Sequence, residues 1–175
     1  MTPTQLTLVF NTLLVGALLA VCWTDIRSRQ IPNPLVAFIL ALGVLRAAED
    51  GSAVRAVALS ASGVLVGAGL LGWQYRRGLI GAGDVKLLAA LGAWTGPVGV
   101  LWLFLVSSLL GGVVAVATWV RLPQEQRQRV AGNVMAAAQF QGFQTSSQGV
   151  PYGVSIALGA LVVIVAGLPF GGFWP

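Results

Sequence analysis

Long apolar runs separated by short polar stretches dominate this chain. Residues 6–23 are apolar apart from Thr7, Asn11 and Thr12, and the run is long enough for one membrane-spanning helix of about 20 residues. Further apolar runs cover residues 35–45, 56–73, 85–94, 98–120 and 150–168. The pattern predicts an all-α, polytopic membrane protein with about six transmembrane helices in a single domain over residues 1–175.

Proline and glycine mark where the predicted helices end. Ile31-Pro32-Asn33-Pro34 closes the first helix, because proline disfavours helix at the residue before it. Thr95-Gly96-Pro97 separates the fourth helix from the fifth. The third helix carries Gly63 and Gly67, a GxxxG spacing that lets two helices approach closely. Residues 121–149 are expected to form one long cytoplasmic connection.

Composition supports the membrane class. Hydrophobic residues make up 57% of the chain and charged residues only 9%, whereas a soluble domain carries roughly 25% charged residues. The net charge of +5 is interpreted as membrane topology rather than nucleic-acid binding, because the basic residues flank apolar runs instead of forming one dense patch.

The basic residues also predict an orientation. With the N-terminus and C-terminus outside, the connections after the first, third and fifth helices face the cytoplasm. These connections hold eight of the 10 basic residues, and Arg46 and Arg55 are the two left outside. Such a distribution follows the positive-inside rule. It places Asp25 and Asp84 together at the cytoplasmic face of the membrane.

The absence of histidine narrows the possible chemistry. Without it, Ser-His-Asp, Cys-His and histidine-zinc sites are excluded. Cys22 is the one cysteine and lies inside an apolar run, so no intramolecular disulfide forms. Carboxylates are therefore the main acid/base groups left.

Two acids stand where apolar segments end or begin. Asp25 follows the first apolar run, and Asp84 follows two glycines in Gly81-Ala82-Gly83-Asp84. Acids at membrane depth are costly and indicate a function by default, although the cost falls near segment ends. Each of the two aspartates also has an interpretation that is only structural. Asp84 fits a helix N-cap, and Asp25 fits a solvated partner of neighbouring arginines.

Three further polar residues have both a functional and a structural interpretation. Lys86 could tune the acid two residues before it, or extend to the interface as an ordinary lysine. Tyr152 could hydrogen-bond a substrate backbone, or belong to an interfacial aromatic belt. Asn33 could cap or orient the second helix, or bond to the site.

Three motifs together resemble the prepilin peptidases (type IV leader peptidases), which are membrane aspartyl proteases of the GxGD class. The motifs are Asp25 followed by Ile31-Pro32-Asn33, then Gly81-Ala82-Gly83-Asp84-Val85-Lys86, then Pro151-Tyr152-Gly153. Each motif is weak by itself, and their order makes the signal specific. The resemblance extends over about residues 20–160.

The resemblance implies that Asp25 and Asp84 are the catalytic pair of an aspartic endopeptidase. The residues implied to bind substrate or shape the site are Gly81, Gly83, Lys86, Asn33, Pro151, Tyr152 and Gly153. The implied reaction removes the short basic leader of a prepilin at the cytoplasmic face of the inner membrane. Partners are the substrate's hydrophobic helix and membrane lipid, and no metal, cofactor or nucleic acid is expected.

The sequence is compatible with two subclasses of the family and with two other functions. Larger family members carry a cytoplasmic domain with paired cysteines and N-methylate the new amino terminus, an activity not expected here. The chain resembles the small peptidases of Flp/tight-adherence pilus systems or the archaeal preflagellin peptidases. One alternative is a proton- or cation-coupled transporter that uses the two aspartates. The other is a structural subunit of a secretion or pilus assembly.

Overall fold

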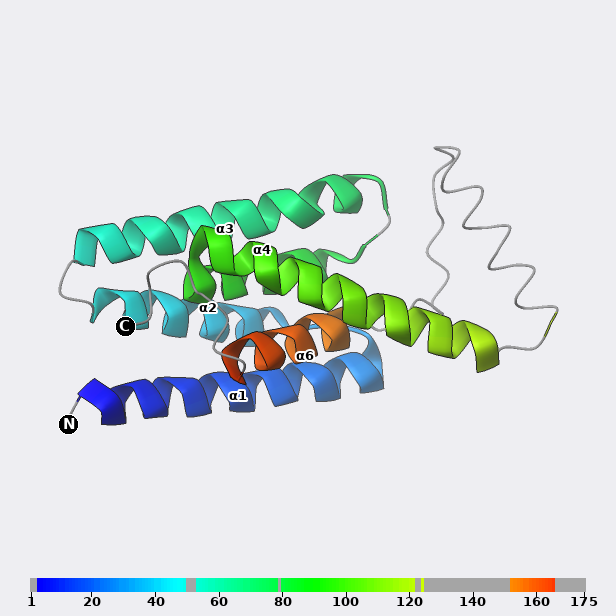
Figure 1. Ribbon diagram of the computed structural model, residues 1–175, viewed down its shortest axis with the longest axis horizontal. Coiled ribbons are helices and arrows are strands. Elements are labelled where there is room, and N and C mark those ends of the chain that lie inside the picture. The colour runs from blue at the N-terminus through cyan, green and yellow to red at the C-terminus, as the bar shows by residue number, and fades with distance from the viewer. Residues whose placement is uncertain (1–2, 50–52, 79, 122–123, 125–151, 166–175) are drawn as a thin grey trace.

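A computed structural model describes residues 3–49, 53–78, 80–121, 124 and 152–165. This part of the chain is all-helical, as predicted (Figure 1). The helices are α1 (Pro3–Ser28), α2 (Asn33–Ala48), α3 (Ala53–Arg76), α4 (Ala82–Arg121) and α6 (Tyr152–Val165). Almost all of the predicted connection over residues 121–149 lies outside the described residues, as do Pro151 and the end of the last predicted run.

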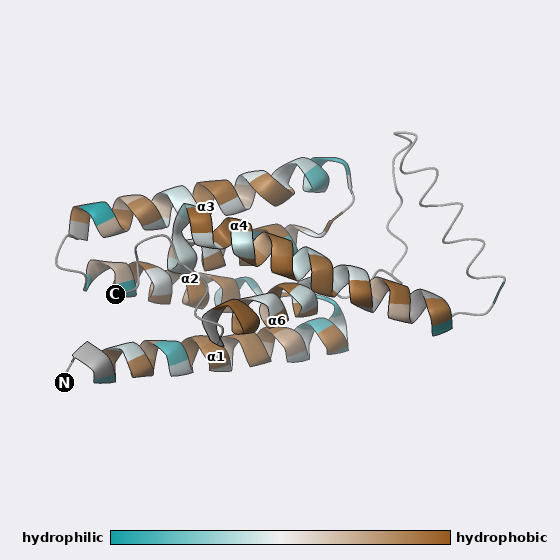
Figure 2. Cartoon of the chain, in the orientation of Figure 1, coloured by the Kyte–Doolittle hydropathy of each residue, from teal (hydrophilic) through white to brown (hydrophobic). Residues whose placement is uncertain are grey.

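Hydrophobic residues occur along every helix (Figure 2), and many of them are exposed on the outside of the bundle as well as buried in its core. Leu65 and Leu109 are 72% and 73% exposed, whereas Leu18 and Leu71 are completely buried. Helices that are apolar on all sides belong in a membrane or in a large core. In the part of the chain that the structure describes, three helices are long and apolar enough to cross a membrane: Gln5–Ser28, Val54–Arg76 and Ala82–Ala117. The protein is therefore an integral membrane protein, and the total of about six spans stays a prediction.

Helix α4 is bent at Gly96-Pro97, the break that the sequence predicts. Gly96 has φ 66° and ψ −176°, a conformation essentially restricted to glycine. Pro97 has no N–H, so the carbonyl of Ala93, four residues earlier, loses its helical donor. The buried Ser60 hydroxyl of α3 donates to this carbonyl at 2.9 Å. The polar group freed by the bend is thereby satisfied inside the bundle.

The bend also reverses the direction of the chain (Figure 1). Before it, α4 runs parallel to α2, because Lys86 pairs with Asn33 and, further along both helices, Trp94 pairs with Ile39. After it, α4 runs antiparallel to α6, with Gly111 beside Ser155 and Ser107 beside Gly159. The second half of α4 therefore returns towards the end of the bundle where the helix began.

Glycines allow α3 and α4 to touch backbone to backbone. A Cβ placed on Gly63 would run into the carbonyl of Gly92, and one on Gly67 would lie 2.8 Å from the carbonyl oxygen of Leu88. The predicted close approach at Gly63 and Gly67 is thus confirmed, with the first half of α4 as the partner helix. Such small-residue contacts are typical of helix packing in membranes.

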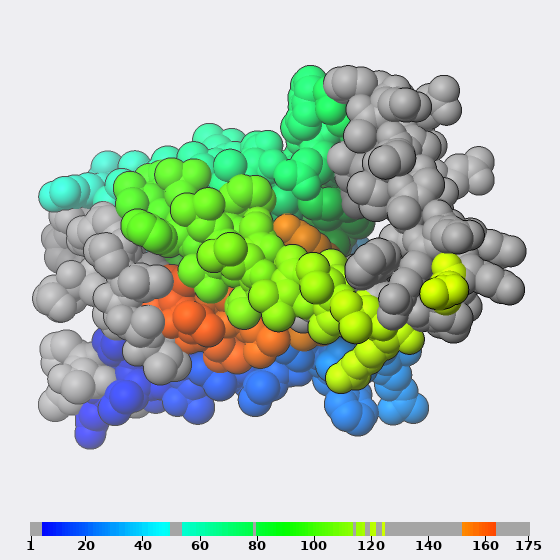
Figure 3. Space-filling model, turned by 45° about the vertical axis from the view of Figure 1, so that its right-hand side comes forward, coloured from blue at the N-terminus to red at the C-terminus, as the bar shows by residue number. Residues whose placement is uncertain are grey.

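Helix α6 lies between α1 and the second half of α4 (Figure 3). It begins beside the end of α1, since Val154 contacts Asp25. The end of α1 and the beginnings of α2, α4 and α6 therefore gather at one end of the bundle. We call this the site end, because Asp25 and Asp84 both lie there.

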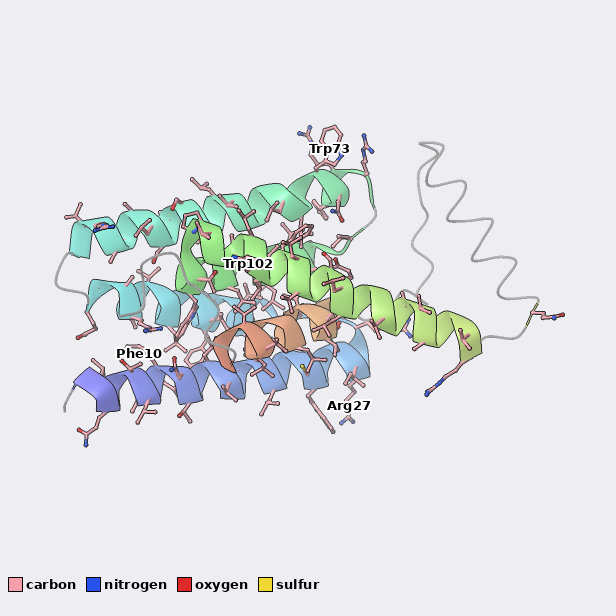
Figure 4. All side chains as sticks on the ribbon, in the orientation of Figure 1. Phe10, Arg27, Trp73 and Trp102 are labelled. Carbon is pink, nitrogen blue, oxygen red and sulfur yellow. The ribbon has the colours of Figure 1, made fainter. Side chains whose placement is uncertain are left out.

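Two exposed tryptophan–arginine pairs lie at the site end, on opposite outer sides of the bundle (Figure 4). The Arg27 guanidinium is 6.0 Å from the Trp23 ring centroid on α1, and Arg77 is 4.4 Å from Trp73 on α3. Trp23 and Trp73 are 66% and 62% exposed. Tryptophan and basic residues of this kind favour the membrane–water interface, and the cytoplasmic orientation of the site end stays a prediction.

Replacing Gly63 by alanine is expected to destabilise the bundle, because the added Cβ has no space against Gly92. Overpacking of this kind costs about 1–3 kcal/mol, seen as a lower midpoint of thermal unfolding in detergent. Gly69→Ala on the same helix is the matched control, since nothing lies within 4 Å of its Cβ position. Equal midpoints for the two variants would show that α3 and α4 are not in backbone contact.

Candidate active site

Asp25 is buried in the last two turns of α1, where it accepts hydrogen bonds from another helix. Its side chain is only 5% exposed. The backbone N–H of Val154 donates to Asp25 Oδ2 at 2.9 Å, and the Gly153 N–H also reaches this carboxylate. The first N–H groups of a helix lack partners within it and favour a negative charge. Asp25 is therefore not a solvated residue, although the charge of Arg29 still acts on it.

Gly153 makes this contact possible because it has no side chain. A Cβ at this position would lie 2.8 Å from Asp25 Oδ2 and 2.9 Å from Ile31 Cδ1. Either contact is closer than a Cβ tolerates, so any larger residue would displace the carboxylate or the helix start. The glycine of the third motif is therefore explained by the approach of Asp25 to α6.

Asp84 lies in the first turn of α4, at the same end of the bundle. The helix starts at Ala82, so Asp84 is its third residue rather than the predicted N-cap. Its carboxylate instead accepts the backbone N–H of Gly81, the residue before the helix. An acid at the third position reaching back in this way is half of a capping box. Asp84 is also half-buried.

The two acids interact although they are far apart in the sequence. Asp25 acts electrostatically on Asp84. The side chain of Ile31 lies 3.3 Å from a Cβ position on Gly83, beside Asp84, and it also borders Gly153, beside Asp25. The structure thus brings together residues from all three predicted motifs. Two neighbouring carboxylates in this arrangement are suited to hold one proton between them.

Asn33 and Lys86 pair at the edge of the site. Lys86 Nζ donates to Asn33 Oδ1 at 3.0 Å, and both side chains are exposed. Pro32 occupies the N-cap position of α2 without a side-chain cap bond. Asn33 therefore ties the start of α2 to the first turn of α4, which agrees with its predicted role in orienting the second helix.

Tyr152 points its ring towards α4. Tyr152 Cε2 lies 3.3 Å from a Cβ position on Gly111, and the residue is half-buried against the core. The absence of a side chain at Gly111 makes room for the ring. Tyr152 is thus packed between α6 and the second half of α4. The neighbouring candidate Pro151 lies outside the described residues.

Two residues with structural roles, Ile31 at the site and Ser60 near the bend of α4, were not singled out by the sequence. Ile31 stands in the helix break and in the first motif, but its side chain has no polar group, so the sequence assigns it no role in the site. Ser60 carried no motif at all, and its partner Ala93 became available only through the bend at Pro97. No local pattern could have indicated Ser60, because its bond to Ala93 depends on how α3 packs against α4.

Fold and site together define a helical membrane protein with a pair of acids at one end of its bundle. Residues 12–116 match the type IV leader peptidase family. This is more than half of the chain, and it includes the first two motifs. The chain therefore belongs to the type IV leader peptidase family.

Curated relatives carry the name prepilin leader peptidase/N-methyltransferase. The one from Xanthomonas campestris is 33% identical over 102 residues, covering 55% of this chain and 36% of that protein. Those from two Burkholderia pseudomallei strains are 28% identical over 163 residues, covering 90% of this chain and 46% of those proteins. The chain thus spans less than half the length of these relatives. No solved structure matches it.

The bond between Asn33 and Lys86 predicts a measurable coupling between the two side chains. Thermal unfolding of Asn33→Ala, Lys86→Met and the double variant should give a coupling free energy of about 0.5–1.5 kcal/mol. Asn33→Asp should raise the midpoint instead, because the lysine then meets a carboxylate. Strictly additive single changes would mean that the two side chains do not hold α2 against α4.

Proposed function

We propose that this protein is an aspartic endopeptidase with Asp25 and Asp84 as its catalytic pair. Its substrates would be type IV prepilins or prepilin-like proteins, cleaved at the cytoplasmic face of the inner membrane. The observation that carries the proposal is that Asp25, at the end of α1, and Asp84, at the start of α4, lie at one end of the bundle, where Ile31 borders a glycine next to Asp84 and a glycine that contacts Asp25. Family membership and the names of the relatives support the substrate class.

The reaction needs one proton shared by the two carboxylates. The ionised carboxylate takes a proton from a water molecule, and the oxygen of this water attacks the scissile carbonyl. The protonated carboxyl polarises the same carbonyl and then passes its proton to the leaving amine. The roles belong to the pair, because two coupled acids titrate as a unit. Bonds from Val154 and Gly81 hold both groups in place before substrate binds.

The position of the pair suits a substrate with a basic leader before an apolar helix. Both acids lie at helix ends, close to exposed interfacial residues such as Trp23 and Trp73. A substrate helix in the bilayer would therefore present the residues just before it to the site. Within this class we propose a Flp/tight-adherence-type prepilin, on the resemblance of the motifs to the small peptidases of those systems.

Each aspartate should be indispensable for cleavage. Wild-type protein in detergent is expected to shorten a co-purified Flp-type prepilin, seen as a mobility shift, whereas Asp25→Asn and Asp84→Asn should be at least about a thousandfold slower. Asn keeps the size of Asp and removes the proton-transfer chemistry. Glu49→Gln is the matched control, because Glu49 is an exposed acid at the C-cap of α2.

Near wild-type cleavage by either aspartate variant would refute the catalytic pair. The same assay tests the transporter alternative, which the family match does not support. Detergent micelles sustain no gradient, so a protein that only couples transport to protons or cations would leave the prepilin intact.

Gly153→Ala should lower kcat by at least about tenfold, because a misplacement of the catalytic group by about 1 Å has effects of this size or greater. The added Cβ would meet Asp25 Oδ2 and push the carboxylate away from Val154 N–H. Gly72→Ala is the control, since its Cβ position has nothing within 4 Å. Cleavage rates measured at saturating prepilin separate the two variants, and equal rates would contradict the role assigned to Gly153.

A further inference from the structure

We propose that Ile31 is a positioning residue that sets the separation of the Asp25 and Asp84 carboxylates. This inference rests on the proposed function. The side chain of Ile31 has no group that could carry a proton, so its role is to position the acids. It is wedged between the two backbone segments that carry or hold the acids, and its bulk keeps these segments at a fixed distance.

The contacts of Ile31 reach both sides of the site. Its Cβ lies 3.3 Å, and its Cγ1 and Cδ1 3.6 Å, from a Cβ position on Gly83, next to Asp84. Its Cδ1 lies 2.9 Å from a Cβ position on Gly153, whose N–H reaches Asp25. Both glycines leave room for the same side chain. One isoleucine thus fills the space between the start of α4 and the start of α6.

The backbone before Ile31 is directed by the way α1 ends. The N–H of Arg29 donates to the carbonyl oxygen of Asp25 at 2.9 Å, and Arg29 has φ 51°. A left-handed residue of this kind ends a helix and turns the chain away from its axis. The turn starts from the catalytic aspartate itself and leads, two residues later, to Ile31.

The backbone after Ile31 is fixed as well. Pro32 has φ −62° and ψ 132°, and its carbonyl accepts the N–H groups of Leu35 and Val36 in the first turn of α2. The Asn33–Lys86 bond ties that turn to α4. Ile31 is therefore held from both sides, and its side chain is packed against the core. A β-branched residue is also stiff at χ1, which suits a spacer.

The separation of the acids decides how they share a proton. The interaction of two charges rises as they approach and as water is excluded from around them. A smaller side chain at position 31 would let the two helix starts move together or admit water. In either case the proton affinity of the pair changes, and with it the fraction of enzyme that carries one proton.

The test compares Ile31→Ala and Ile31→Val with Ile39→Ala, a fully buried isoleucine in α2. Cleavage of the Flp-type prepilin is measured in detergent over a range of pH. Ile31→Ala should lower kcat at least about tenfold, with KM within about twofold, and should change the distance between the two limbs of the bell-shaped pH profile. Ile31→Val, which keeps the branched stem, should stay within about threefold of wild type.

Ile39→Ala should lose thermal stability and keep both limbs of the wild-type pH profile, because Ile39 lies further along α2, at the level of Trp94 rather than of the helix starts. A pH profile for Ile31→Ala identical to wild type would overturn the proposal, whatever the loss of stability. The proposal would also be overturned if Ile39→Ala changed the pH profile as much as Ile31→Ala does, because the effect would then result from weaker packing in general.

A second readout needs no substrate. Thermal midpoints of wild type, Ile31→Ala and Ile39→Ala are followed from about pH 4 to pH 8, where coupled carboxylates contribute to the pH dependence of stability. Ile31→Ala should change the shape of this curve, and Ile39→Ala should only lower it. A wild type that never cleaves prepilin would refute the proposed function, whereas an unchanged curve shape in Ile31→Ala would refute the role of Ile31.

Discussion

The hydrogen bond from Val154 N–H to the Asp25 carboxylate is the contact on which the site depends. It joins residues 129 positions apart at 2.9 Å and fixes the start of α6 against the end of α1. A buried carboxylate without donors would be strongly disfavoured. The unpaired N–H groups of a helix start supply such donors without any further side chain. Gly153 is needed for this contact, because a side chain there would occupy the position of the carboxylate.

Asp84 reaches the same place through the packing of α4. The first half of this helix is held against α3 by Gly63 and Gly67, and against α2 by the Asn33–Lys86 bond. The bend at Gly96 then lets the second half return along α6. A straight helix over this length could support one acid, but it could not also provide the wall against which α6 packs. Because of the bend, the first half of α4 carries Asp84 and the second half packs against α6, the helix that binds Asp25.

Membrane surroundings change which contacts stabilise the protein. Apolar side chains such as Leu65 and Leu109 gain little by turning inward, because lipid is as apolar as the core. Close packing and satisfied polar groups have to hold the helices together. The glycine contact between α3 and α4 and the bond from Ser60 to Ala93 are of this kind. Ile31 extends the same close packing into the site, where its side chain packs against Gly83 and Gly153.

The sequence by itself determined the helical class and the break at Thr95-Gly96-Pro97, and it singled out Asp25 and Asp84 as candidate acids, whose pairing was implied by the resemblance of the motifs. These features follow from local apolar runs, from proline and glycine, and from the absence of histidine. Only the tertiary structure decided that Asp84 is the third residue of its helix, that Gly153 accommodates Asp25, and that Ile31 separates the two helix starts. Each of these depends on contacts between residues far apart in the chain. No local pattern specifies which helix end such a contact will meet, because that is set by how all the helices pack.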